Sequence, residues 1–328
     1  RDRPMQPDTP RPGPRWLARL NAGFMILCLA AGFVAVVMTG LGFRWPDGDR
    51  SFVDGEWTGL YERDMDDLFV TRQAAIAFWA GIDWGVFGDG RRGVVPGRDG
   101  WLFTVEEFEQ PDAADAAIRA KVAAVVHTRD RLAAAGVPRL IIALVPDKAR
   151  VYHAQLDGIT QRPEHAARYQ AFRAALLEAG IAAPDLLAAL EAASRSTQTY
   201  MRTDTHWTPA GAAVAADALA AAVRASADPP PSLDTTAFTT HEEPVADHHG
   251  DLLRFIPLGA LRAWLWGPLE RLTPRITMAA ADAESDADAL RFGDQTIPAV
   301  LVGTSFSAMD AWNFDGALKQ ALGMDVLN

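Results

Sequence analysis

Short apolar runs alternate with alanine-rich helical segments along much of the chain, and this alternation limits the possible folds more than any other feature. The runs 139–145 and 297–302 are mostly Ile, Leu, Val and Ala, a composition typical of strands buried on both faces. Segments 117–135 and 163–179 read as helices that end at a following Gly. Strands that alternate with helices predict an α/β fold with a mostly parallel sheet.

Further elements are predicted from turn and capping residues. Thr208 and Pro209 suit the N-cap and first position of a helix that runs to residue 225. The Pro-Gly and Asp-Gly pairs within 95–103 predict a hairpin that leads into a strand. The remaining predictions are short strands at 181–183 and 199–202, helices at 184–194 and 311–322, and helical patches between 60 and 79.

Charge and cysteine content exclude some classes of protein. The formal net charge is −11, so we expect no direct binding of nucleic acid. Cys28 is the single cysteine, so neither an intramolecular disulfide nor a cysteine zinc site can form. The redox compartment stays open, because many domains outside the cytoplasm lack disulfides.

Residues 22–43 contain no charged side chain, and about 20 apolar residues suffice to cross a bilayer. We therefore predict a transmembrane anchor at 21–43, with a buried core helix and a long cleaved signal peptide as alternatives. Five arginines precede this segment, against two aspartates: Arg1, Arg3, Arg11, Arg15 and Arg19, with Asp2 and Asp8. The positive-inside rule then places the N-terminus in the cytoplasm and the rest of the chain outside.

The predicted organisation has four parts. A proline-rich cytoplasmic tail at 1–20 and the anchor at 21–43 precede a linker or collar at 44–94. A catalytic domain follows at 95–328, with an insertion at about 226–296 that contains a linker at 229–236 and an acidic loop at 279–289. Within the insertion, the apolar run 252–269 is expected either to lie on a membrane or membrane partner or to pack its Trp residues on its own domain.

Three polar side chains are expected to meet at the carboxyl ends of the predicted strands, where open α/β sheets form their sites. Ser305 follows the run 297–302 in a Gly-Thr-Ser turn that resembles a nucleophile elbow. Asp204 and His206 follow the short strand 199–202, directly before a helix. Together they predict a serine nucleophile, a histidine general base and an aspartate that orients the histidine.

Each motif alone has a simpler interpretation. A Gly-x-Ser turn after a strand is usually an ordinary turn, and Asp204 and His206 can act as helix caps. Lys148 follows the run 139–145 and is either a surface lysine or a residue that supports the site. His248 and His249, beside Asp247 and Asp251, suggest a metal pair, although their spacing is not that of a helical ligand set. We predict no metal and no cofactor.

Five blocks together resemble the alginate O-acetyltransferase family, the AlgJ/AlgX-like branch of the SGNH hydrolases. They are Gly97-Arg-Asp-Gly-Trp-Leu-Phe103, Val145-Pro-Asp-Lys148, Thr203-Asp-Thr-His-Trp-Thr-Pro209, Gly250-Asp-Leu252 and Leu301-Val-Gly-Thr-Ser-Phe-Ser307. The resemblance implies a three-layer α/β/α fold, with Asp204, His206 and Ser305 as the catalytic residues. The Ser block follows the Asp-His block, whereas in ordinary SGNH esterases it comes first. We expect no carbohydrate-binding module within residues 1–328.

The resemblance also implies a function. It predicts transfer of acetyl groups, through an acetyl-serine, to hydroxyls of an exopolysaccharide in the periplasm. The enzyme would be a single-pass protein of the bacterial inner membrane and would work with a membrane-bound O-acyltransferase (MBOAT). Lys148, Thr304 and Trp207 are predicted to bind substrate or support the site. An acetylesterase of the same fold and a non-catalytic adaptor are the alternatives.

Overall fold

The computed structural model describes residues 15–42, 55–68, 70–109, 114–159, 163–225, 237–280 and 298–328. Residues 1–14 of the predicted tail, 44–54 of the collar, the linker 229–236 and most of the acidic loop lie outside the described residues. The chain divides into two compact units. One comprises residues 1–82 with 258–262, and the other comprises residues 83–257 with 263–328.

The first unit is helical. It contains α1 (Arg15–Gly42), α2 (Glu56–Leu68) and α3 (Val70–Ile82), and α1 contacts the other two helices. The short 3-10 turn η6 (Gly259–Leu261) packs on α3, where Gly259 lies against Ala77. These helices confirm the helical patches predicted between residues 60 and 79.

Within the described residues, no helix combines the length and the hydropathy that a membrane crossing requires. The structure therefore does not support the predicted transmembrane helix at 21–43.

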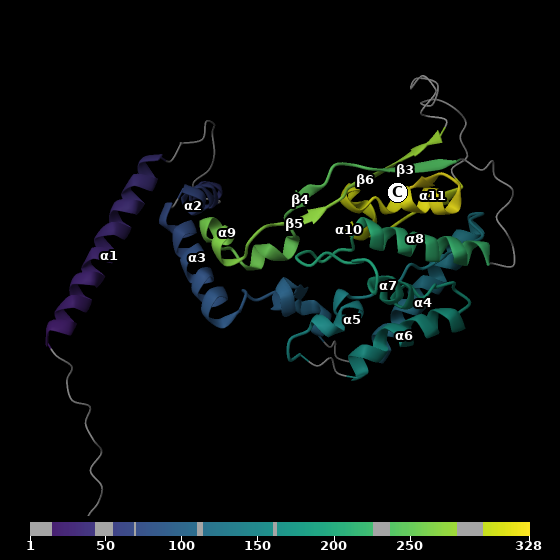
Figure 1. Cartoon of the computed structure of the whole chain (residues 1–328), viewed down its shortest axis with the longest axis horizontal. Helices are drawn as coiled ribbons and strands as arrows, with labels where there is room; N and C mark the ends of the chain where they lie inside the picture. Colours follow the sequence, from purple (N-terminus) through teal and green to yellow (C-terminus); the bar gives the residue numbers. More distant parts are fainter. Residues whose placement is uncertain are drawn as a thin grey trace, which may run out of the picture. The chain divides into compact units, whose positions relative to one another are not determined.

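Five of the described helices confirm the predictions at 117–135, 163–179, 184–194, 208–225 and 311–322, and most of the described helices lie in the second unit (Figure 1). They are α4 (Ala114–Ala134), α5 (Lys148–Val151), α6 (Pro163–Glu178), α7 (Leu186–Ser194), α8 (Pro209–Arg224), α9 (Arg262–Leu265), α10 (Ser305–Ala308) and α11 (Phe314–Leu322). Thr208 caps α8 as predicted, because its hydroxyl accepts a hydrogen bond from the Gly211 N–H at 3.1 Å. Gly136 and Gly180 follow α4 and α6 with φ values of 88° and 73°, which are open to glycine at little cost.

Shorter helical turns connect these elements. They are η1 (Asp83–Phe87), η2 (Arg98–Gly100), η3 (Val105–Phe108), η4 (His153–Gln155), η5 (Asp251–Phe255) and η8 (Asp310–Trp312).

The prediction of a mostly parallel sheet is wrong for the described residues, which form four separate strand pairs. Three pairs are antiparallel: β1 (Val94–Pro96) with β2 (Leu102–Thr104), β3 (Phe238–Glu242) with β6 (Arg275–Ala279), and β4 (Ala246–His248) with β5 (Glu270–Leu272). The fourth, β7 (Ala299–Val300) with β8 (Val326–Leu327), is parallel. The β1–β2 pair confirms the hairpin predicted at 95–103.

The apolar runs misled the strand prediction because they are neither continuously paired nor fully buried. Residues 139–145 and 181–183 share only an isolated parallel bridge between Ile141 and Ala182. In the run 297–302, the side chain of Val302 is 90% exposed. Apolar composition signals a strand only where neighbouring strands use the backbone donors and acceptors.

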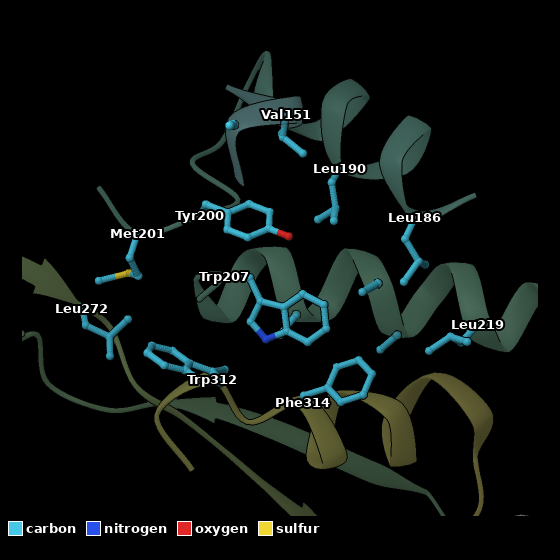
Figure 2. Packing of buried hydrophobic residues seen from close by; sticks show 14 of the residues in the cluster. Val151, Leu186, Leu190, Tyr200, Met201, Trp207, Leu219, Leu272, Trp312 and Phe314 are labelled. Carbon is cyan, nitrogen blue, oxygen red and sulfur yellow. The ribbon is translucent and has the colours of Figure 1, made fainter. Parts of the chain in front are cut away.

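The main core of the second unit lies between α7, α8 and the segment that leads into α11 (Figure 2). The alanine-rich face of α8 lets neighbouring backbone approach closely, and a Cβ atom added to Gly211 would lie 2.0 Å from the Thr199 carbonyl oxygen. The rings of Trp207 and Phe314 pack with their centroids 4.9 Å apart. This core fixes the segment 199–208 against α8 and α11.

The apolar run 252–269 divides between burial and exposure. Leu252, Leu253 and Ile256 are buried, and Trp266 packs on Trp84 with ring centroids 4.7 Å apart. Trp264, in contrast, is 83% exposed. Much of the run therefore packs on its own domain.

Candidate active site

The segment 199–208 is a narrow loop closed by main-chain hydrogen bonds. The Thr208 N–H donates to the Thr199 oxygen at 2.9 Å, and the Met201 N–H donates to the His206 oxygen at 3.0 Å. Tyr200 and Trp207 form an isolated antiparallel bridge between these bonds. The predicted strand at 199–202 is therefore one arm of this loop, which carries Asp204 and His206 at its tip.

Ser305, His206 and Asp204 form a continuous chain of hydrogen bonds. Nε2 of His206 lies 2.6 Å from Oγ of Ser305, and Nδ1 of His206 lies 2.7 Å from Oδ1 of Asp204. Because an ionised carboxylate only accepts, Nδ1 carries the proton and Nε2 is free to accept the proton of the serine. The structure thus brings together the three residues predicted to form the site.

Asp204 is buried, and its carboxylate takes part in four hydrogen bonds with protein groups. Besides the ring of His206, Oδ1 accepts a hydrogen bond from the main-chain N–H of His206 at 3.0 Å. Oδ2 accepts hydrogen bonds from Nε2 of His248 at 2.9 Å and from the main-chain N–H of Asp251 at 3.0 Å. Burial alone would raise the pKa of Asp204, but these hydrogen bonds outweigh it and hold the pKa well below the usual range. These hydrogen bonds therefore favour the ionised carboxylate.

The nucleophile turn places Ser305 at the first position of α10, on the exposed surface. Thr304 is the N-cap residue of this short helix, and its hydroxyl faces the Phe306 N–H at 3.4 Å. The indole N–H of Trp312 donates to the Ser305 carbonyl oxygen at 3.3 Å, and the side-chain amide of Asn328 donates to the Ser307 oxygen at 2.7 Å. These contacts hold the turn without occupying the serine hydroxyl.

Aromatic rings fix the plane of the His206 imidazole. The ring of Trp312 stacks on it with a centroid distance of 5.0 Å and an interplanar angle of 20°, and the ring of Phe306 lies 4.7 Å away. The histidine therefore has little freedom to rotate away from Ser305.

Lys148 is a buried cation behind the loop rather than a surface lysine, with a side chain only 1% exposed. Its ammonium donates to the carbonyl oxygens of Met201, Arg202 and Asp204 at 3.1, 3.3 and 2.7 Å. Burial lowers the pKa of Lys148 to about 8, against the opposing charges of Glu107 and Asp204. Lys148 thus supports the site by holding the loop.

Glu107 is the buried acid that accompanies Lys148. Its carboxylate accepts the Thr104 and Ala149 N–H groups at 2.9 and 2.6 Å, which ties η3 to α5. Burial raises the pKa of Glu107 to about 7, although the charge of Lys148 opposes this rise. Burial thus shifts the pKa values of both groups toward neutrality, upward for Glu107 and downward for Lys148.

Trp207 and Thr304, predicted to bind substrate or support the site, have different places. Trp207 is buried in the core, and its indole nitrogen has no hydrogen-bond partner among the described residues. It therefore supports the loop by packing. Thr304 is exposed beside Ser305, and its role as N-cap fixes the start of α10.

The sequence interpretation missed three polar residues that complete the site. Asp251 accepts the Thr205 N–H at 2.8 Å, and Glu270 accepts the N–H groups of Arg202 and Thr203 at 2.8 and 3.1 Å. His248 had been considered only as half of a metal pair. Asp251 stood beside that pair and in the Gly-Asp-Leu block, and these were its available signals, whereas no spacing in the sequence singled out Glu270.

Donor atoms of Asp204, His206 and Asp251 lie within 4.8 Å of one another, close enough to be tested as a cation site. Both oxygens of Asp204, both ring nitrogens of His206 and Oδ1 of Asp251 make protein hydrogen bonds. Hydrogen bonding by itself accounts for this cluster. His248 likewise binds Asp204 rather than pairing with His249.

Comparison with known proteins agrees with this geometry. Residues 94–328 match the family described as ALGX, SGNH hydrolase-like domain, acetyltransferase AlgX. The "Probable alginate O-acetylase AlgJ" of Pseudomonas fluorescens is 39% identical over 307 residues, which covers 93% of this chain and 76% of the relative. The protein of the same name from Pseudomonas aeruginosa is 38% identical over 287 residues, covering 85% and 72%.

Solved structures show the same relationship. The O-acetyltransferase domain of Pseudomonas putida AlgJ aligns with a TM-score of 0.62 and 39% identity, over 73% of this chain and 79% of that one. Pseudomonas aeruginosa AlgX, at 23% identity and a TM-score of 0.50, covers 72% of this chain and 53% of its own and shares the fold. On this evidence, the chain belongs to the AlgX family of SGNH hydrolase-like acetyltransferases and has the α/β fold of that family.

Proposed function

We propose that the protein is a polysaccharide O-acetyltransferase that carries the acetyl group on Ser305. The observation that carries this proposal is the hydrogen-bonded chain from Ser305 through His206 to Asp204. An exposed serine hydroxyl 2.6 Å from a fixed imidazole is suited to nucleophilic attack on an acyl carbonyl. The names of the relatives support acetyl transfer as the reaction class.

In the first half-reaction, Oγ of Ser305 attacks the carbonyl carbon of the acetyl donor, and Nε2 of His206 takes the hydroxyl proton. The tetrahedral intermediate then collapses, the bond to the donor's leaving group breaks, and His206 returns the proton to that group. Asp204 stabilises the imidazolium that exists between these two transfers. Acetyl-Ser305 and the deacetylated donor are the products.

In the second half-reaction, a sugar hydroxyl attacks the carbonyl carbon of acetyl-Ser305, and His206 takes the proton of that hydroxyl. Collapse of the second intermediate releases the acetylated sugar, and His206 returns the proton to Oγ of Ser305. Attack by water instead of a sugar would release acetate. Transferase and esterase thus share every residue and differ only in the acceptor.

The relatives are named as alginate O-acetylases, so alginate is the first acceptor to test. We further propose that the reaction takes place on the periplasmic side of the bacterial inner membrane and that an MBOAT supplies the acetyl group. The family resemblance supports this partner. Exposed apolar side chains on α1, among them Phe24, Leu27 and Phe33, support a location beside an apolar surface.

The decisive experiment uses the full chain and an acetyl ester that releases a chromophore. Mass spectrometry should detect one added acetyl group on the peptide that contains Ser305, and added alginate should become acetylated. Ser305→Ala should abolish both signals, while Ser196→Ala, at an exposed serine outside the site, should keep them. Ester cleavage at the wild-type rate in Ser305→Ala would leave a non-catalytic adaptor as the better interpretation.

A further inference from the structure

We propose that His248 is a positioning residue for acyl transfer: it fixes Oδ2 of Asp204, so that Oδ1 stays directed at His206. This inference rests on the proposed function and adds a fourth side chain to the catalytic device. His248 acts through Asp204.

The two oxygens of Asp204 are each bound by a different imidazole. Oδ1 lies 2.7 Å from Nδ1 of His206, and Oδ2 lies 2.9 Å from Nε2 of His248. A carboxylate held at only one oxygen can turn about its terminal bond, which would move Oδ1 away from His206. The bond from His248, with that from the Asp251 N–H at 3.0 Å, opposes this rotation.

The fold delivers His248 to this position through a short antiparallel ribbon. His248 is the last residue of β4 and stands opposite Glu270 of β5. Glu270 accepts the N–H groups of Arg202 and Thr203, so the same ribbon holds the backbone just before Asp204. The ring of Trp312 lies 5.6 Å from that of His248 at 71°, and it also stacks on His206. Both imidazoles thus share one aromatic neighbour.

Three acidic groups face His248: Asp204 from the catalytic loop, Asp251 from η5 and Glu270 from β5. The hydrogen bond to Asp204 raises the pKa of His248, although partial burial opposes the rise. A larger share of His248 is therefore cationic near neutral pH. That positive charge offsets part of the charge of Asp204, and its removal would leave the carboxylate pulling more strongly on the proton held by His206.

Two substitutions separate the hydrogen bond from the charge. His248→Gln keeps an N–H donor for Asp204 but is always neutral, whereas His248→Ala removes both. We expect kcat for ester cleavage to fall about 10- to 100-fold in His248→Ala, with little change in KM. Losses of this size are typical when a residue that orients an active-site ligand through a hydrogen bond is removed. His248→Gln should recover most of kcat, with the acid limb of its pH–rate profile shifted to higher pH.

His249→Gln is the matched control, because the exposed neighbouring histidine should leave kcat and the pH profile unchanged. A purely structural role would lower the stability of the His248 variants and leave the pH profile of the folded enzyme in place. Wild-type kcat in His248→Ala, or a wild-type pH profile in His248→Gln, would overturn the inference. An inactive Ser305→Ala beside such results would leave the proposed function intact, whereas an active Ser305→Ala would refute that function itself.

Discussion

The ammonium group of Lys148 lies 2.7 Å from the main-chain oxygen of Asp204, so a buried cation supports the backbone of the residue whose carboxylate binds His206. The same ammonium binds two further carbonyl oxygens of the loop, those of Met201 and Arg202. One side chain therefore donates to three main-chain acceptors, of which the Arg202 oxygen also accepts the Leu102 N–H at 2.9 Å. Lys148 thus acts on the loop together with Glu270, which accepts the N–H groups of Arg202 and Thr203.

Replacement of Lys148 by Met should therefore destabilise the protein. The substitution leaves the buried carbonyl oxygens of Met201 and Asp204 without the ammonium donor, and it leaves Glu107 without the neighbouring positive charge. We expect the free energy of unfolding to fall by about 3 to 5 kcal/mol. Urea denaturation of the two proteins measures this difference. Lys121→Met, at an exposed lysine of α4, should change the stability by less than about 0.5 kcal/mol. Equal stabilities of the Lys148 variant and the wild type would contradict the role assigned to Lys148.

Asp204→Asn should lower kcat by about four orders of magnitude, the loss seen when a triad carboxylate is neutralised with its geometry intact. The amide can no longer accept at both positions, so the tautomer of His206 that leaves Nε2 free is no longer favoured. Initial rates of ester cleavage at saturating substrate test this expectation. Asp247→Asn is the control. Asp247 directly precedes His248 but is exposed, so this variant should retain wild-type rates. A tenfold loss or less in Asp204→Asn would argue against a triad.

Glu107 should make the stability fall as pH rises from about 4.5 to about 7. Its folded-state pKa of about 7 exceeds the ordinary glutamate pKa of 4.5, so between these two values the folded protein keeps a proton that the unfolded chain has released. The expected contribution is on the order of 1–3 kcal/mol, and it is lost once the carboxyl ionises in both states. Urea denaturation of Glu107→Gln at pH 5 and pH 7.5 should show a smaller pH dependence than the wild type.

Glu106→Gln is the control for this comparison, because Glu106 is the exposed neighbour in η3 and should keep the wild-type pH dependence. If Glu107→Gln and the wild type lost stability in parallel between the two pH values, the burial of Glu107 would not be the cause.

Gly250→Ala should displace the segment that supports Asp204. A Cβ atom at this position would lie 2.1 Å from the carbonyl oxygen of Thr203, and that neighbour is backbone, which cannot move aside cheaply. We expect a loss of about 1–3 kcal/mol in stability and a lower kcat, because the Asp251 N–H would shift away from Asp204. Thermal unfolding and ester cleavage measure the two effects.

Gly59→Ala provides the contrast for this test. Nothing lies within 4 Å of a Cβ atom at that position of α2, so the change should leave stability unchanged or raise it slightly. An unaffected Gly250→Ala would show that η5 can move without disturbing the site.

The helices and three central site residues were predictable from the sequence because their signals are local. Thr208 with Pro209, and the glycines after α4 and α6, mark helix ends through conformations that those residue types favour. The Asp-Thr-His-Trp and Gly-Thr-Ser blocks placed Asp204, His206 and Ser305, which the fold then brought into hydrogen-bond distance.

The sheet and the outer parts of the site could not be predicted, because they depend on contacts between distant segments. The run 297–302 has strand composition, yet only Ala299 and Val300 pair with β8. For Lys148 the sequence left a surface lysine and a supporting residue as alternatives, because its three acceptors come from a loop more than fifty residues away. His248 had no spacing relation to Asp204, and only the pairing of β4 with β5 brings it there.

The carboxylate and the base lie together on one loop, while the nucleophile arrives on the segment 298–328. Because synthesis proceeds from the N-terminus, a growing polypeptide exposes His206 before Ser305 has been made. Ser305 meets His206 only when the segment 298–328 folds back onto the loop, so labelling of Ser305 by a serine-reactive ester would report the moment at which these two parts of the fold come together.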